Sequence, residues 1–503
     1  MREAVRHAAG LAVSAVALLA LTGCDLGPDY HRPTLEIPPA WRASAATAET
    51  AWPSADWWRG FGSPELNALI DQARQENFDL LAAIARVRQA DAQVRIAGAG
   101  LLPSLGATAA ANWAQESVLN AGRAGRNSAV NVDLHNYSAG INVAYVVDFW
   151  GKLAATRQAA EASAMFSRFD QQTVALTVVT SVGNTWFTAL GDADQLAVQR
   201  RNLADAEQTL AVIRGRLEAG TASALDMAQQ EALVAGVRAS IPALRSQMEQ
   251  QIIGLGILVG HPPEAVTVRP GTLTTLTLPP VAAGLPSCLL QRRPDVASAE
   301  AQLIAANFDV KVARAAFFPQ IQLTGSAGFQ ATALTTLFGP GAFLTTLAAG
   351  LAQPLFDGGT LRGQLEQAKG RQAELLADYR KAVVQAFTDV DNALTAWRYL
   401  TEQEALQRIA VDTAQRAADI ARAQMQAGTV DITTVLTAET TLYADENTLV
   451  QVRLGRVQAL LNLYKALGGG WNEPPGPVPD QFPGLSPGMV PGGVALPIGE
   501  DLR

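Results

Sequence analysis

Residues 152–217 read KLAATRQAAEASAMFSRFDQQTVALTVVTSVGNTWFTALGDADQLAVQRRNLADAEQTLAVIRGRL, a stretch without proline that predicts one very long helix. Leucine recurs at every seventh position in its second half, at Leu196, Leu203, Leu210 and Leu217. A seven-residue period keeps one seam facing a partner helix and imposes a left-handed supercoil. At about 1.5 Å per residue the helix would be on the order of 100 Å long. Because it cannot bury this seam alone, other segments must pack against it.

An internal duplication supplies these partners. A second proline-free stretch, 360–427, has about the same length and also follows a glycine. Four matches between the copies share the offset 208 (359 − 151): Gly151 with Gly359, Gly220-Thr221 with Gly428-Thr429, Glu231 with Glu439, and Gly260 with Gly468. A fixed offset is the signature of a repeated structural unit. We therefore expect one architecture that is built twice.

The composition excludes several functions. The 503 residues carry a formal net charge of −8, with 17% charged and 6% aromatic residues. An acidic chain without a basic cluster argues against nucleic acid as a partner. Two cysteines, Cys24 and Cys288, provide no disulfide framework.

The N-terminus has the pattern of a secretory signal peptide over residues 1–23, with two arginines before a short apolar run. The run ends in Leu21-Thr22-Gly23-Cys24, which resembles a bacterial lipobox, and this resemblance implies that Cys24 carries lipid such as palmitate. A buried cysteine beside an ordinary cleavage site is the alternative. Asp25 resembles an inner-membrane retention signal in enteric bacteria, which leaves the sorting of the lipoprotein open.

Two β-hairpins are predicted, over 103–150 and 319–355, because apolar residues alternate with small or polar ones there. Within the first, residues 116–136 are rich in Gly, Asn, Ser and Arg and are expected to form a loop, with aromatic residues near the strand ends. Four strands cannot close a membrane barrel, but three chains would provide twelve. A soluble sandwich is the alternative. No apolar run after the signal reaches 18 residues, so no transmembrane helix is expected.

These elements predict a mainly helical protein with a small β part, divided into six segments. After the signal peptide, residues 24–63 are extended, and 64–260 form the first repeat, with a return helix over 222–259 that Pro242 breaks. A linker, 261–293, leads to the second repeat, 294–468, with a return helix over 431–467. A tail rich in proline and glycine follows, 469–503.

Several motifs together resemble one family. They are GPDYHRP (27–33), WWRGF (57–61) with PEL (64–66), RRPDV (292–296) with AFFP (316–319), and QPLFDGG (353–359). In this order they resemble the TolC-like outer membrane factors, in particular the NodT-type lipoprotein efflux ducts of RND tripartite pumps. The resemblance implies the TolC-like fold: a homotrimer with an α-barrel of long coiled-coil helices and a shared 12-stranded transmembrane β-barrel. It also implies a periplasmic adaptor (membrane fusion protein) and an inner-membrane RND pump as partners.

The functional residues are expected at the two tight turns between long helices. Gly220-Thr221 and Gly428-Thr429 mark these turns, where glycine permits the positive φ that ends a helix. The resemblance implies that the turns form the periplasmic mouth, where the adaptor docks and the duct opens. The family often carries an aspartate ring before an alanine on the return helix, but Thr437-Ala438 stand here, so Asp226 and Asp431 are the nearest carboxylates that could replace it.

No catalytic or metal-binding constellation is present. His31, His135 and His261 lie in different segments, and HExxH, GxSxG, P-loop and CxxC motifs are missing. We therefore expect no enzyme, no metal and no cofactor. The predicted function is an exit duct in the outer membrane of a Gram-negative bacterium that exports small toxic compounds or drugs. The alternatives are a periplasmic coiled-coil adaptor or structural lipoprotein, and the duct of a type I protein secretion system.

Overall fold

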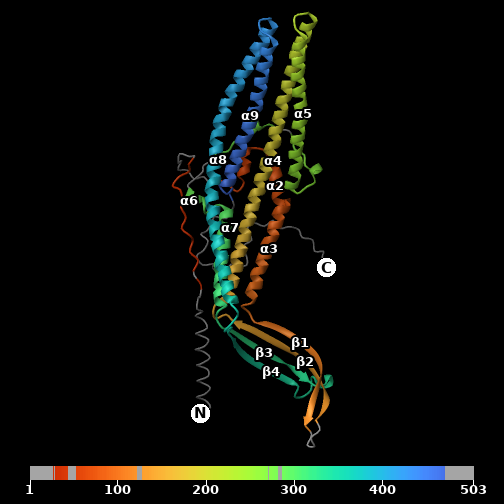
Figure 1. Ribbon diagram of the computed structural model, residues 1–503, viewed down its shortest axis with the longest axis vertical. Helices are drawn as coiled ribbons and strands as arrows, with labels where there is room; N and C mark the ends of the chain where they lie inside the picture. Colours follow the sequence, from red (N-terminus) through yellow and green to blue (C-terminus); the bar gives the residue numbers. More distant parts are fainter. Residues whose placement is uncertain are drawn as a thin grey trace.

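The computed structural model describes residues 27, 29–42, 53–121, 127–269, 271–280 and 286–470. The expected signal peptide, Cys24, and nearly all of the predicted tail lie outside the described residues. The protein is elongated, with long helices at one end and a β-sheet at the other (Figure 1).

Each repeat consists of a helix before a hairpin, a very long helix and a return helix. The long helices, α4 (Lys152–Glu218) and α8 (Thr360–Gln426), each have 67 residues, or about 100 Å at 1.5 Å per residue. The other helices are α2 (Pro64–Glu76), α3 (Phe78–Ala99), α5 (Ala224–Val259), α6 (Pro286–Leu289), α7 (Pro294–Ala315) and α9 (Ile432–Ala466), with 3-10 turns η1 (Trp57–Phe61), η2 (Pro263–Ala265), η3 (Leu273–Thr275) and η4 (Leu334–Thr336).

The helices form one curved layer. Near the sheet its order is α3, α4, α7, α8, and toward the far end it is α5, α4, α9, α8. Shorter helices are thus stacked end to end beside α4 and α8 (Figure 1). In the second half of α4, Leu196 is buried and the later leucines of the seven-residue pattern are half-buried, while Ala206 and Ile213, also seven residues apart, are fully buried against neighbouring helices.

The predicted break at Pro242 is wrong, because α5 continues through this residue. A proline in a helix removes one N–H donor, here the donor to the carbonyl of Arg238. The hydroxyl of Ser240 donates to the neighbouring carbonyl of Val237 at 2.8 Å, which adds a polar contact beside the gap. Packing of α5 along α4 supplies the remaining stability that keeps the helix continuous.

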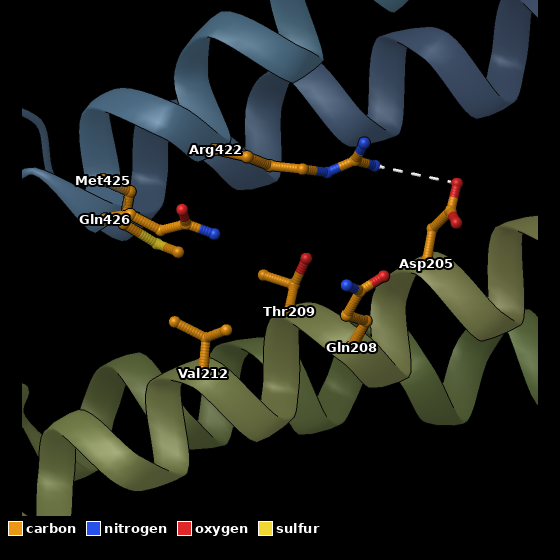
Figure 2. A pocket seen from close by; sticks show the side chains of 7 residues that line it. All are labelled: Asp205, Gln208, Thr209, Val212, Arg422, Met425 and Gln426. Carbon is orange, nitrogen blue, oxygen red and sulfur yellow. Dashed lines mark ion pairs between the residues drawn. The ribbon is translucent and has the colours of Figure 1, made fainter.

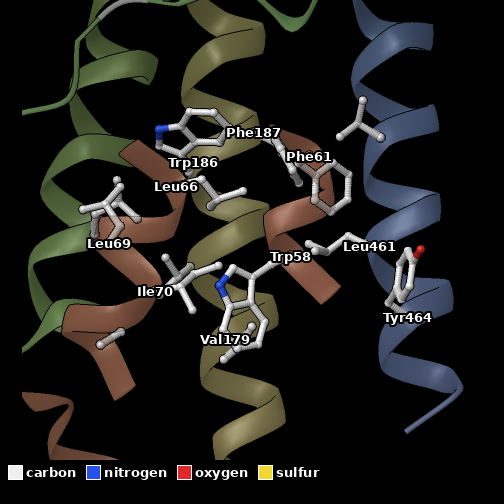
Figure 3. Packing of buried hydrophobic residues seen from close by; sticks show 14 of the residues in the cluster. Trp58, Phe61, Leu66, Leu69, Ile70, Val179, Trp186, Phe187, Leu461 and Tyr464 are labelled. Carbon is white, nitrogen blue, oxygen red and sulfur yellow. The ribbon is translucent and has the colours of Figure 1, made fainter. Parts of the chain in front are cut away.

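The main hydrophobic core lies at mid-length, where η1 packs between α4 and α9, and α2 packs between α4 and α5 (Figure 3). The rings of Trp57 and Tyr464 stack with centroids 4.8 Å apart and an interplanar angle of 6°. Phe61 and Phe187 lie with ring centroids 5.0 Å apart. The WWRGF motif therefore forms an aromatic plug that joins the two repeats.

A buried arginine connects three helices of the second repeat. The Arg293 guanidinium contacts Asp295 at 2.6 Å and Asp389 at 2.9 Å, and it donates to the backbone carbonyl of Ala466 at 3.2 Å. These contacts connect the start of α7 to α8 and α9. Removing one partner of such a buried group is costly, so the RRPDV motif has a structural role.

The sheet has four antiparallel strands in the order β1 (Ser104–Ala121), β2 (Asn127–Val147), β3 (Gln320–Ala331) and β4 (Phe343–Ala352). Its register places the alternating apolar residues of all four strands on one face, for example Ala111 opposite Tyr137, which lies opposite Ala331. The other face carries small and polar residues, and Asn142 Nδ2 donates there to Thr108 Oγ1 at 3.0 Å. The sheet therefore has one face suited to lipid and one suited to water.

The predicted loop over 116–136 is largely wrong. The strands continue to Ala121 and begin again at Asn127, with Val118 paired to Val130. The polar composition suggested a loop, but antiparallel backbone hydrogen bonds do not depend on side-chain polarity, and β-branched residues favour the strand. As a result Trp113 and Tyr137 lie inside long strands rather than near their ends.

The first hairpin extends past the second. Pairing between β2 and β3 covers residues 137–147 and 321–331, a length that matches the about 9–11 residues of a membrane-crossing strand. Phe329 and Phe343 pair at the far end of this shared part. Within the described part of the chain, one helix, α4, contains an 18-residue window apolar enough to cross a membrane, and 56% of that window is buried, as in a core helix.

Candidate functional site at the helical tips

The two turns that the sequence singled out lie at the same end of the molecule, opposite the sheet (Figure 1). One joins α4 to α5 and the other joins α8 to α9. Gly220 has φ +73° and Gly428 has φ +77°, values that favour glycine over every residue with a Cβ.

The turns have the same hydrogen bonds. The backbone N–H of Thr221 donates to the carbonyl of Arg216 at 2.8 Å, and that of Thr429 donates to Gln424 at 2.9 Å. Both threonine hydroxyls donate to the same carbonyls, at 3.1 and 3.0 Å. These bonds satisfy carbonyls at the helix ends and fix two similar, rigid turns.

The two aspartates occupy different positions in the turns. Asp226 is the third residue of α5, and its carboxylate accepts from the Ser223 backbone N–H at 2.7 Å. Asp431 is the N-cap of α9 and accepts from the N–H of Thr434 at 3.1 Å and from its hydroxyl at 2.9 Å. These bonds to Thr434 lower the pKa of Asp431. Each carboxylate caps its own helix, and a role of either in a gate stays a prediction.

A cleft of about 250 Å³ lies below the tips, between α4 and α8 (Figure 2). Its lining is Asp205, Gln208, Thr209, Val212, Arg422, Met425 and Gln426. Arg422 extends from α8 toward Asp205 on α4, with Nη2 and Oδ2 3.9 Å apart. Arg216 of α4 also donates to the carbonyl of Met425. Polar contacts between the α4–α5 pair and the α8–α9 pair thus cross the cleft.

A fully buried carboxylate lies behind the cleft. Glu439 of α9 is 0% exposed, and its Oε1 accepts from Arg422 Nε and from Thr209 Oγ1, both at 2.8 Å. Its Oε2 has no hydrogen-bond partner within the described part of the chain. Burial, followed by the nearby Glu439 charge, raises the pKa of Tyr443. One carboxylate therefore holds α4, α8 and α9 together close to the tips.

A second charged cluster lies farther from the tips. Glu404, 4% exposed, contacts Arg408 at 2.7 Å and Arg453 at 3.1 Å, and it also pairs with Arg456. Sequence reasoning did not predict roles for Arg422, Glu404 or Glu439. For Glu404 the available signal was its spacing of fourteen and twenty-one residues from Ala418 and Met425, positions at which a buried apolar residue is the rule.

No three His, Cys, Asp or Glu side chains come together as metal ligands among the described residues. His261 pairs with Glu76 at 2.6 Å, and this contact joins the end of α5 to the end of α2. The lipidation predicted at Cys24 falls outside the described residues.

Long paired helices joined to a sheet with one apolar face define a class of protein, the membrane channel subunit with a helical extension. The sequence model of the outer membrane efflux protein family matches residues 69–261 and 285–469. The chain belongs to this family, and it is an outer membrane efflux channel of the TolC-like type. This assignment agrees with the resemblance seen in its motifs.

Relatives match over nearly the whole chain. The pyoverdine export outer membrane protein OpmQ of Pseudomonas aeruginosa is 41% identical over 458 residues, which cover 91% of this chain and 96% of OpmQ. The cation efflux system protein CusC of Escherichia coli is 30% identical, covering 90% of this chain and 97% of CusC. Among solved structures, the outer-membrane channel OprN has a TM-score of 0.82 at 26% identity, covering 89% of this chain and all of that chain (100%).

Proposed function

We propose that three copies of this chain form the exit duct of a tripartite efflux system in the outer membrane. Small toxic compounds would pass from an inner-membrane RND pump, through a periplasmic adaptor, into the duct and out of the cell. The duct itself would hydrolyse nothing and need no cofactor, since the pump would supply the energy.

The observation that carries this proposal is the pair of open edges on each protomer. Among the described residues, β1 and β4 have no strand on their outer sides, and lipid cannot satisfy their backbone groups. In the helical layer, α8 forms one edge, and α3 with α5 forms the other. Joining such edges in a ring of three would close both a twelve-stranded barrel and a helical tube.

The helical edges carry the exposed apolar surface that such contacts need. Phe78 and Ile257 are 65% and 74% exposed beside a hollow of about 570 Å³ on one edge. Leu406 and Ile409 are 61% and 62% exposed on α8. Large exposed apolar patches of this kind mark protein interfaces.

At the tips, we propose that the adaptor docks and that the duct is gated. The residues concerned are Gly220, Thr221, Asp226, Gly428, Thr429 and Asp431. Their rigid turns would present a defined surface to the adaptor, and the cleft between α4 and α8 lies where the two helical pairs could separate.

The transported compound would be selected by the pump. Relatives are named for export of pyoverdine, for cation efflux and for toluene efflux, so one duct architecture accompanies different cargo. We also propose lipid on Cys24 as an anchor, since buried acyl chains add roughly 0.8 kcal/mol per CH₂.

Replacing Leu406 tests the ring. In detergent we expect the wild type and Leu406→Met to have the mass of a trimer, whereas Leu406→Glu would dissociate, because a charge would enter an apolar contact. A monomeric wild type would refute the ring. In cells, a deletion strain should become sensitive to at least one toxic compound, and the tagged protein should capture a periplasmic adaptor; failure of both would refute the efflux assignment.

A further inference from the structure

The buried carboxylate of Glu439 has a counterpart in the first repeat that is left exposed. Glu439 is held by Arg422 of its own repeat, whose Nε lies 2.8 Å from Oε1. The offset between the repeats places Arg214 and Glu231 at the same two positions of α4 and α5 (422 − 214 and 439 − 231, both 208). Both side chains are exposed in the protomer, and no ion pair joins them within the described part of the chain. The charged residues of the site are thus present twice, but only one of the two sites is enclosed.

The offset holds in three dimensions as well as in the sequence. The long helices α4 and α8 both have 67 residues and begin 208 residues apart (360 − 152). In the sheet, the facing pair Ala111 and Tyr137 corresponds to the facing pair Ala327 and Thr345, with offsets of 216 (327 − 111) and 208 (345 − 137). A contact seen in one repeat therefore identifies the residues at the same level of the other repeat.

The first site lacks the wall that α4 provides for the second. Glu439 lies at the joint between α9 and α4, where Thr209 Oγ1 donates to its Oε1 at 2.8 Å. Along the layer the order is α5, α4, α9, α8, and near the tips α5 has no helix on its other side among the described residues (Figure 1). In a ring, the helix beside α5 is α8 of the next protomer. Because α8 corresponds to α4, its Ala417 stands where Thr209 stands (417 − 209 = 208).

The side chains along these two open edges are complementary at another level. Within the protomer, Gly191 of α4 packs against Leu454 of α9. The matching residues on the open edges are Tyr399 of α8, which is 58% exposed, and the exposed Ser246 of α5. A small residue that faces a large one is replaced by a large residue that faces a small one, so the volume at the contact is kept. These edges are therefore matched to each other, as the joint between α4 and α9 is.

We propose that a second copy of this chain completes the first site. Its α8 covers Glu231, so that a ring of three holds an Arg214–Glu231 pair at each boundary between protomers, in addition to the Arg422–Glu439 pair within each protomer. Arg214 is the residue that allows the carboxylate to be covered, because a buried charge needs a partner. This inference rests on the ring proposed above.

The site between protomers has fewer partners than the site within each protomer. On the neighbouring α8, Ala417 replaces Thr209 and offers no hydroxyl to Glu231. Thr413 likewise replaces Asp205, so the arginine has no second carboxylate there. A buried carboxylate with fewer donors is held less firmly. The tips therefore separate first between protomers, along α5 and the neighbouring α8, before the cleft within each protomer opens.

The experiment supplies the missing hydroxyl with Ala417→Thr. Amide hydrogen exchange is measured near the tips of α5 and α8, in the full chain purified as a trimer in detergent. Exchange should slow about tenfold, the effect of a hydrogen bond between a hydroxyl and a carboxylate. In a Glu231→Leu background, the same substitution should slow exchange no further.

The matched control is Ala423→Thr, the same substitution on α8. Its match on α4 is Gly215, beside which there is open space, so position 423 lies outside the joint. Exchange in this variant should stay within about twofold of the wild type. Equal slowing by Ala417→Thr with and without Glu231, or slowing no greater than that of the control, would overturn the inference.

Cross-linking tests the same contact without a buried charge. A Cβ at Gly191 would lie 3.5 Å from that of Leu454, a separation that a disulfide spans. The matching pair, Tyr399→Cys with Ser246→Cys, should therefore link neighbouring protomers. Leu406→Cys with Ser246→Cys is the control, because seven residues move the cysteine about 10 Å along the helix. A trimer that cross-links only in the control would overturn this inference alone, whereas a monomer in detergent would refute the ring as well.

Discussion

Replacing Arg422 by methionine would test the buried charge pair near the tips. In the native protein, Glu439 is 0% exposed and shares its Oε1 between Arg422 and Thr209. After the replacement, the carboxylate would keep only the Thr209 hydroxyl. An uncompensated buried charge of this kind costs about 3–5 kcal/mol.

The cost should appear as local opening of the helical tips, since the sheet and the mid-length core do not touch this pair. A change of about 3 kcal/mol corresponds to a factor of roughly 150 in an opening equilibrium. Amide hydrogen exchange of α8 and α9 near the tips should therefore accelerate by about two orders of magnitude. Exchange around the aromatic plug of Trp57 and Tyr464 should not change.

Two further variants complete the experiment. The double variant Arg422→Met with Glu439→Leu removes both charges, so its exchange should return to within about tenfold of the wild type. Arg416→Met is the matched control, because Arg416 lies on the same helix and bonds only locally, to Asp412 and Thr413, among the contacts of the described residues. If the single and double variants open equally, or if neither opens, the charge pair does not hold the tips together.

Four other outcomes are expected. Asp192→Asn should raise the free energy of unfolding by about 1 kcal/mol at neutral pH, because burial raises the pKa of Asp192 and its Oδ2 has no partner among the described residues. The gain should vanish below about pH 4, where the native carboxyl is protonated, and a gain independent of pH would contradict the argument. Asp431→Asn should keep the cap of α9 but remove its charge. If Asp431 belongs to the gate, the variant should change the cation block and the conductance of the duct in bilayers, and unchanged values would exclude Asp431 from the gate. Bonds to Thr434 lower the pKa of Asp431, so the stability that this cap gives to α9 should persist above about pH 4 and decline only as the pH falls through the lowered pKa. Amide hydrogen exchange at the start of α9 would measure this decline. Trp57→Ala should lower the free energy of unfolding by about 3–5 kcal/mol, because the stacking contact with Tyr464 is lost. An unchanged unfolding temperature would argue against the plug.

Much of the helical body could be predicted from local pattern. A seven-residue period and the lack of proline are properties of single stretches, so the limits of α4 and α8 follow closely from sequence. The turns at Gly220 and Gly428 could be located because a positive φ restricts the residue type. Pro242 and residues 116–136 were misjudged, because packing along α4 and pairing across a hairpin outweigh local preferences.

The sequence by itself determined the duplication, the alternation of the strands and the sites of the tight turns, since each depends on neighbours along the chain. Only the tertiary structure decided which charges are buried. Glu231 and Glu439 match in the two repeats, yet the first is exposed and the second is enclosed by α4, α8 and α9. The environment of a carboxylate is set by helices more than 200 residues apart, as the contact of Glu439 with Thr209 illustrates, and no local pattern contains that information.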